Sequence, residues 1–166
     1  TLLYGGLIPS RLHTLGEDEA LERLMLLKTL REKNPSVKLY AFHCIMRCPT
    51  YSSDDEEPDY YADYGAEIHQ LGRLTHLEKL GMGDAQDCAA MREKIDADAL
   101  ADYLNRRAFN RRMNIRTLDL VEDGTIDFLI IPQDDSTKYG YTAMDQQAVR
   151  AVIDEKVLND RVILYP

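Results

Sequence analysis

Two adjacent aspartates, Asp134 and Asp135, are the residues of this sequence best suited to chemistry. They follow the apolar run 128–132, whose composition is typical of a buried strand. Neighbouring side chains point to opposite faces inside a strand, but beyond its end the backbone turns, and both carboxylates can reach one cavity. Two carboxylates in one pocket move each other's pKa apart, so that one is protonated while the other is ionised. Such a pair suits a general acid with a charged partner, or a hard metal ion. In the structural alternative, Asp135 makes an Asx turn and Asp134 is solvated.

Polar residues that could contact a substrate follow three of the expected strands. A glycine pair in the first strand would allow a close approach of the backbone, and an arginine after it could clamp a carboxylate, a phosphate or a sugar hydroxyl. The alternative for each arginine is a surface position. The candidate substrate-binding residues are Tyr4, Gly5, Gly6, Ser10, Arg11, Arg47, Tyr51, Gln133, Lys138 and Tyr139. The four histidines have no metal-ligand spacing, and we predict neither a metal nor a cofactor.

The elements that position these residues alternate between strands and helices. We expect strands over residues 1–8, 37–46, 126–132 and 161–166. We expect helices over residues 16–34, about 59–80, 96–124 and 142–158, with Thr142 as the N-cap of the last. The strands are almost wholly apolar, which is typical of a parallel sheet with both faces buried. The sequence therefore predicts an α/β fold of parallel β/α units in a single domain over residues 1–166.

Two parallel architectures fit this alternation. A doubly wound sheet usually carries a glycine-rich nucleotide-binding turn, and "YGGLIPSR" is neither a dinucleotide fingerprint nor a phosphate loop. In a (β/α)8 barrel, the carboxyl ends of the strands supply the polar residues of the site, as three strands do here. We therefore expect part of a TIM-like barrel, with flanking parts of the full-length protein missing.

Two further polar patterns accompany the strand ends. The loop over residues 51–65 is acidic and rich in tyrosine, which suits a lid or a binding loop, although packing is the commoner role of such tyrosines. A second pattern recurs at helical spacing and forms one stripe, for which we favour a solvated face paired with acids over a pocket lining. Its members are Arg107, Asn110, Arg111 and Asn114.

Composition restricts the possible partners. The chain has 166 residues, of which 45% are hydrophobic and 30% charged, and its formal net charge is −9. Without a long run of lysine and arginine, we expect neither a nucleic-acid nor a membrane partner, but a small-molecule or carbohydrate substrate. No apolar run approaches the roughly 20 residues that span a bilayer. The three cysteines cannot all pair within one chain, and we predict a reduced, cytoplasmic setting. The oligomeric state stays open.

Five stretches of the sequence form a recognisable set: "YGGLIPSR", "LYAFHCIMRCPTYSS", "EEPDYYADYG", "RRAFNRRMN" and "PQDDSTKYG". Together they resemble the bacterial domain-of-unknown-function 4127 family. The resemblance runs from Tyr4 to the final "ILYP", and it implies a longer protein of which this chain is a fragment. The family implies no activity.

The aspartate pair alone also resembles that of retaining hexosaminidases of the O-GlcNAcase type, which place adjacent aspartates at a barrel strand end. The resemblance implies that Asp134 orients an acetamido group of the substrate, which acts as nucleophile, while Asp135 is the general acid. Our first hypothesis is a carbohydrate-active hydrolase. The alternatives are a Mg²⁺- or Mn²⁺-dependent hydrolase that uses the same pair, and a non-catalytic ligand-binding or assembly module.

Overall fold

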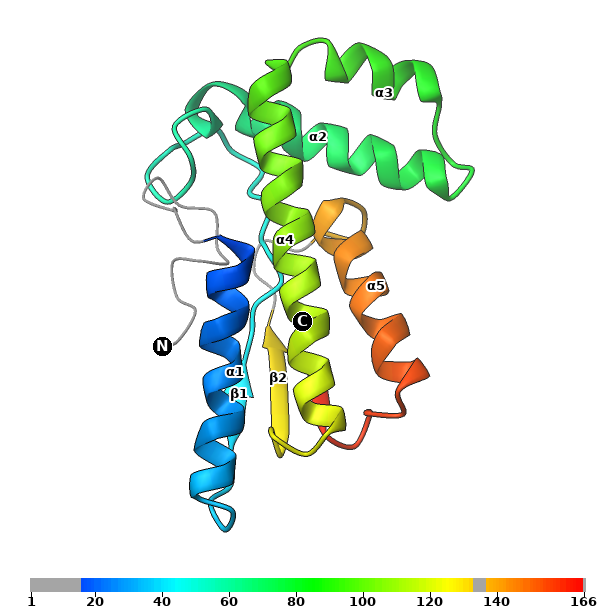
Figure 1. Cartoon of the computed structure of the whole chain (residues 1–166). Coiled ribbons are helices and arrows are strands. Elements are labelled where there is room, and N and C mark those ends of the chain that lie inside the picture. The colour runs from blue at the N-terminus through cyan, green and yellow to red at the C-terminus, as the bar shows by residue number, and fades with distance from the viewer. Residues whose placement is uncertain (1–15, 133–136, 166) are drawn as a thin grey trace.

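The computed structural model describes residues 16–132 and 137–165 (Figure 1). The predicted strand over residues 1–8 lies outside these ranges. No helix within them is both long enough and apolar enough to cross a membrane. In chain order the elements are α1 (Glu17–Lys33), β1 (Tyr40–Phe42), α2 (Tyr61–Lys79), α3 (Ala85–Arg92), α4 (Ala97–Glu122), β2 (Phe128–Pro132), α5 (Tyr141–Glu155) and β3 (Val162–Tyr165).

The three described strands form one parallel sheet in the order β1-β2-β3, which confirms the predicted α/β fold. Tyr40 lies opposite Phe128, and Leu129 lies opposite Val162. β1 is shorter than the predicted strand 37–46, but its backbone ladder continues. Beyond Phe42, the N–H of His43 donates to Ile130 O at 3.1 Å, and that of Ile45 donates to Pro132 O at 3.0 Å.

Three helices, α1, α4 and α5, cover the same face of this sheet. Parallel strands placed in sequential order have this consequence, because each right-handed crossover returns on the same side. Alternate strand residues meet the helices in one apolar core. This core contains Ala20 and Leu24 of α1, Phe109, Met113, Leu118 and Val121 of α4, Val149 and Ile153 of α5, and Leu129, Ile131, Val162 and Leu164 of the strands.

The opposite face of the sheet is apolar but open in the described part of the chain. Five of its large side chains are between 42% and 75% exposed, so the expectation that both faces are buried is wrong for the described residues. A run of apolar residues indicates that both faces of a strand can be buried. It does not indicate which part of the protein buries the second face. The residues are Tyr40, Phe42, Ile130, Ile163 and Tyr165.

The long helix α4 joins the sheet layer to a second cluster of apolar residues. Its C-terminal half packs on the sheet, whereas its N-terminal part packs against α2 and α3, which project beyond the sheet (Figure 1). The side chain of Asp96 caps α4 by accepting from the N–H groups of Asp98 and Ala99. The members of the second cluster include Met46, Cys48, Tyr61, Ile68, Leu71, Leu100, Tyr103 and Tyr141.

Two local expectations were wrong. Thr142 lies inside the first turn of α5 and is not its N-cap, which is Gly140. The hydroxyl of Thr142 donates instead to Met46 O at 3.3 Å, because a distant backbone carbonyl lies within its reach. The second concerns α1, whose leucines at helical spacing (Leu21, Leu24, Leu27 and Leu30) predict one buried face. Leu30 is exposed, and the fully buried residues of the helix are Ala20 and Leu24.

Candidate functional site

The carboxyl ends of β1 and β2 lie side by side, because the two strands are parallel neighbours. Of the predicted site residues, Arg47 and Tyr51 follow β1, and Lys138 and Tyr139 follow β2. The others lie outside the described residues, and their predicted roles stay predictions. They are Asp134 and Asp135, the candidate catalytic pair, together with Tyr4, Gly5, Gly6, Ser10, Arg11 and Gln133.

The segment Cys44–Cys48, which leads out of β1, is held by side chains of α4. Asn110 accepts from the N–H of Met46 through Oδ1 at 2.9 Å and donates from Nδ2 to Cys44 O at 3.1 Å. One side-chain amide thus satisfies a backbone donor and a backbone acceptor, as a neighbouring strand would. Asn114 adds a longer contact to Cys44 O at 3.4 Å.

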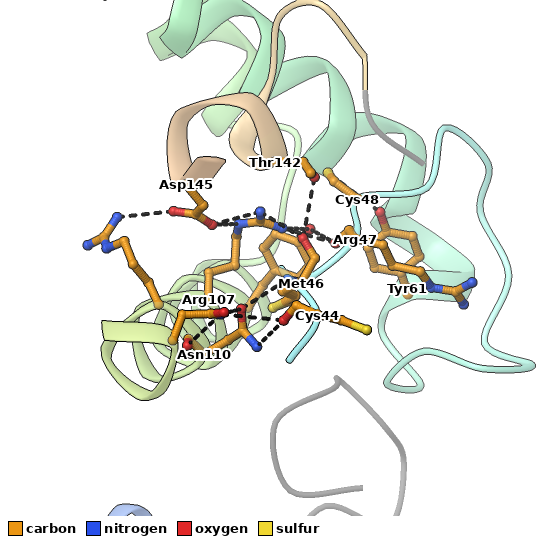
Figure 2. Close-up of polar contacts among 12 residues, drawn as sticks. Cys44, Met46, Arg47, Cys48, Tyr61, Arg107, Asn110, Thr142 and Asp145 are labelled. Carbon is orange, nitrogen blue, oxygen red and sulfur yellow. Dashed lines mark hydrogen bonds and ion pairs between the residues drawn. The ribbon is translucent and has the colours of Figure 1, made fainter. Parts of the chain in front are cut away.

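Arg107 is the centre of this network (Figure 2). Its guanidinium is 4% exposed and donates to two backbone carbonyls, Met46 O and Arg47 O, each at 3.0 Å. Two further bonds, at 3.0 and 2.8 Å, reach the Oδ2 atom of Asp145 in the first turns of α5. Arg107 therefore ties the end of β1 to the beginning of the helix that follows β2.

Aromatic rings complete the surroundings of this buried cation. The Cζ atom of Arg107 lies 5.7 Å from the ring centroid of Tyr103 and 5.5 Å from that of Tyr141. Burial opposes the charged form, but the contacts with Tyr103 and Asp145 outweigh it, so that the pKa of Arg107 is raised. The guanidinium of Arg107 therefore keeps its charge although it is buried.

The solvated interpretation of the polar stripe on α4 is therefore wrong. Arg107, Asn110 and Asn114 are buried, and their partners are mostly backbone atoms of the segment that leaves β1. The expected pairing with an acid is found for Arg107 and Arg111, which both donate to Asp145. Of the four side chains, that of Arg111 alone is also solvated in part, at 43% exposed. The helical spacing located the stripe, but nothing in the spacing named its partners.

The guanidinium of Arg47 is engaged with the acidic loop. Its Nε donates to Glu57 at 2.6 Å, and its Nη2 donates to Glu56 at 2.8 Å. Glu57 is 1% exposed, and although burial opposes the charge on Arg47, the hydrogen bond to Glu57 raises the pKa of the arginine. Arg47 thus anchors the loop that contains the exposed Tyr51, and its contact with a substrate stays a prediction.

The segment Thr137–Gly140 leads from β2 into α5, and it is held by α2. The N–H of Gly140 donates to Nδ1 of His76 at 3.2 Å, and the ring of Tyr139 lies edge-on to the same imidazole at 5.7 Å between centroids. The ammonium of Lys138 lies over the ring of Tyr139, 5.1 Å from its centroid. Nothing in the sequence linked His76 to this segment, because the residues are 64 positions apart.

Comparison with protein families places the chain in one of them. The model of a family described as "Protein of unknown function (DUF4127)" matches residues 1–166. The chain belongs to the DUF4127 family. No curated protein and no solved structure matches it. The family resemblance predicted from the sequence is therefore confirmed over the whole DUF4127 chain, and the activity has to be inferred from the site.

The buried tyrosines and cysteines of this DUF4127 chain have structural partners. The hydroxyl of Tyr61 donates to Pro49 O at 2.9 Å, and that of Tyr60 donates to Asp102 at 2.8 Å, which favours the packing role for the tyrosines that begin α2. Burial raises the pKa of Tyr141 to about 12 and also raises that of the Cys48 thiol, so neither group is an activated nucleophile. In the described part of the chain, no three acidic, histidine or cysteine side chains form a metal-binding group.

Proposed function

We propose that this DUF4127 chain is part of a (β/α)8-barrel enzyme that hydrolyses a carbohydrate, with Asp134 and Asp135 as its catalytic carboxylates. The observation that carries the proposal is the sequential parallel sheet, whose covering helices within the described residues all lie on one face. A doubly wound sheet carries helices on both faces, whereas a barrel carries them on the outside only. The open apolar face would then be the barrel interior, filled by side chains of further strands.

The position of the aspartates in the chain supports the same proposal. Only Gln133 separates Asp134 from Pro132, the last residue of β2. Sites of barrel enzymes are built at the carboxyl ends of the strands, where the loop after β1 also begins. Lys138, Tyr139 and the exposed Tyr51 belong to the same two strand ends and could contact hydroxyl groups or stack on a sugar ring.

In the proposed reaction, Asp135 protonates the leaving oxygen while Asp134 orients the acetamido group of the substrate. The acetamido oxygen attacks the anomeric carbon, the glycosidic bond breaks, and water then opens the cyclic intermediate. The proposal includes a cytoplasmic setting and a small sugar as substrate, in keeping with the formal net charge of −9, which disfavours nucleic acid and anionic lipid.

Thermal unfolding of the full-length protein tests this function. We expect N-acetylglucosamine to raise the unfolding midpoint of the wild type, because a ligand that binds only the native state stabilises it by mass action. The increase should vanish in Asp134→Asn and Asp135→Asn. The matched control is Asp154→Asn, an exposed aspartate on α5, which should respond as the wild type does.

Two results would overturn the proposal. A midpoint raised by Mg²⁺ or Mn²⁺ but not by the sugar, and lost in the two variants, would assign the pair to a metal site. No increase with any of the three ligands would leave the aspartates as a turn after β2, and the non-catalytic module would become the better explanation.

A further inference from the structure

Helix α2 packs closely against the beginning of α5 at Gly72. Gly72 and His76 lie one turn apart on α2, and they contact Tyr141 and Gly140. A Cβ atom at Gly72 would lie 2.5 Å from Cδ2 of Tyr141, so only glycine leaves room for this ring. His76 is 2% exposed. The contact between the two helices is therefore close and specific at this point.

His76 accepts a hydrogen bond from the backbone of Gly140. Its Nδ1 atom accepts the backbone N–H and therefore carries no proton in this contact. Gly140 has a φ of 155° and has no side chain with which to cap α5. The start of this helix is therefore fixed by an acceptor from another element.

The same imidazole also holds the residues that precede Gly140. Tyr139 meets it in a T-shaped contact with an interplanar angle of 77°, and Lys138 lies over Tyr139. Lys138 is exposed and Tyr139 is partly exposed. A sequence of contacts thus runs from the buried His76 to two side chains at the carboxyl edge of the sheet.

We propose that His76 is a positioning residue that holds Lys138 and Tyr139 in place for ligand binding at the carboxyl edge. Its role in binding rests on the proposed function, whereas its hold on the segment Thr137–Gly140 does not. His76 acts through Gly140 and Tyr139 and does not itself touch the ligand.

Two substitutions separate positioning from simple packing. In His76→Asn, the Oδ1 atom lies about as far along the side chain as Nδ1 and can accept from Gly140. In His76→Leu, the site keeps an apolar side chain of similar bulk but loses the acceptor. Packing alone favours leucine over asparagine at a buried position, whereas positioning favours asparagine.

Amide hydrogen exchange on the full-length protein measures how strongly His76 restrains the segment 137–140. We expect His76→Leu to speed exchange in peptides that cover residues 137–144 on the order of tenfold, as for the loss of one buried hydrogen bond. His76→Asn should stay close to the wild type. The control Val121→Ala removes core volume from the C-terminal end of α4, far from His76. It should leave the exchange of residues 137–144 unchanged. Equal exchange in both His76 variants, fast or slow, would overturn the inference.

The midpoint increase with N-acetylglucosamine supplies the second readout. We expect it to be reduced in His76→Leu and retained in His76→Asn. If the wild type shows no increase, the proposed sugar is wrong, and the exchange result alone decides whether His76 holds the segment. If His76→Leu speeds exchange but binds the sugar as the wild type does, the positioning role is overturned while the proposed function stands.

Discussion

The two segments that leave the sheet at its carboxyl edge are held in different ways. Cys44–Cys48, after β1, gives its backbone polar groups to Asn110 and to the charged Arg107, both buried on α4 (Figure 2). Thr137–Gly140, after β2, is held by one neutral hydrogen bond to His76 and by an aromatic contact. The first arrangement contains an ion pair and charge-assisted bonds, whereas the second contains neither among the described residues.

This difference separates a fixed region from an adjustable one. Charge-assisted hydrogen bonds are roughly twice as strong as neutral ones, and a buried ion pair is costly to break. Segments that bind ligands are usually drawn from the less stable parts of a protein. We therefore infer that the end of β1 is the more rigidly held of the two segments and that the segment after β2 is the easier one to displace.

Removing the charge of Arg107 should have the largest effect. Among the described residues, Arg107→Met leaves the buried Asp145 with only the partly exposed Arg111 as an ion-pair partner. It also leaves Met46 O and Arg47 O with only the longer bonds from the hydroxyls of Thr142 and Tyr103, at 3.3 and 3.4 Å. We expect the free energy of unfolding in urea to fall by about 3–5 kcal/mol. Arg111→Met is the matched control and should cost about 0–1 kcal/mol, because that side chain is largely solvated. Similar losses of unfolding free energy in the two variants would contradict the inference that Arg107 is the main link between the end of β1 and α5.

A pH dependence should follow from His43, which continues the ladder of β1. Burial lowers the pKa of His43 from 6.5 to about 4, while its Nδ1 lies 3.0 Å from the hydroxyl of Thr117. The unfolded chain takes up a proton as the pH falls through 6.5, and the folded chain does not until about pH 4. Stability from this group is thus complete above pH 6.5 and is lost below it.

The expected loss from His43 is about 3 kcal/mol between pH 7 and pH 4. Urea unfolding at a series of pH values measures it, with His43→Leu as the reference for the carboxylates that titrate in the same range. The difference in slope between the two proteins belongs to His43. Parallel curves would show that folding does not lower the pKa of His43.

The order and type of the described elements were predictable because their signals are local. Acidic residues in the first turn and the Asn34-Pro35 pair delimit α1, and Asp96 and Gly124 delimit α4 within one or two residues. The apolar runs gave β2 and β3 in the same way. Each of these signals lies within a few residues of the boundary that it marks.

The hydrogen bonds and ion pairs that hold the strand ends could not be predicted, because they join residues far apart in the chain. Arg107 and Met46 are separated by 61 positions, and an arginine at helical spacing has the same sequence signal whether it meets solvent or a backbone carbonyl. The open face of the sheet was missed for a related reason. Apolar strand residues indicate that a face of the sheet is suited to burial, but the described residues bury one face only.

The smallest effect on stability is expected for Lys138, and it sharpens the contrast between the two segments. Its exposed ammonium lies over the ring of Tyr139 and has no ion-pair partner among the described residues. Lys138→Ala should therefore change the free energy of unfolding by less than about 0.5 kcal/mol in urea. If the same variant also weakens the midpoint increase with N-acetylglucosamine, the residue serves binding and not the fold. A clear loss of stability would instead show that the segment after β2 is as firmly built as the segment after β1.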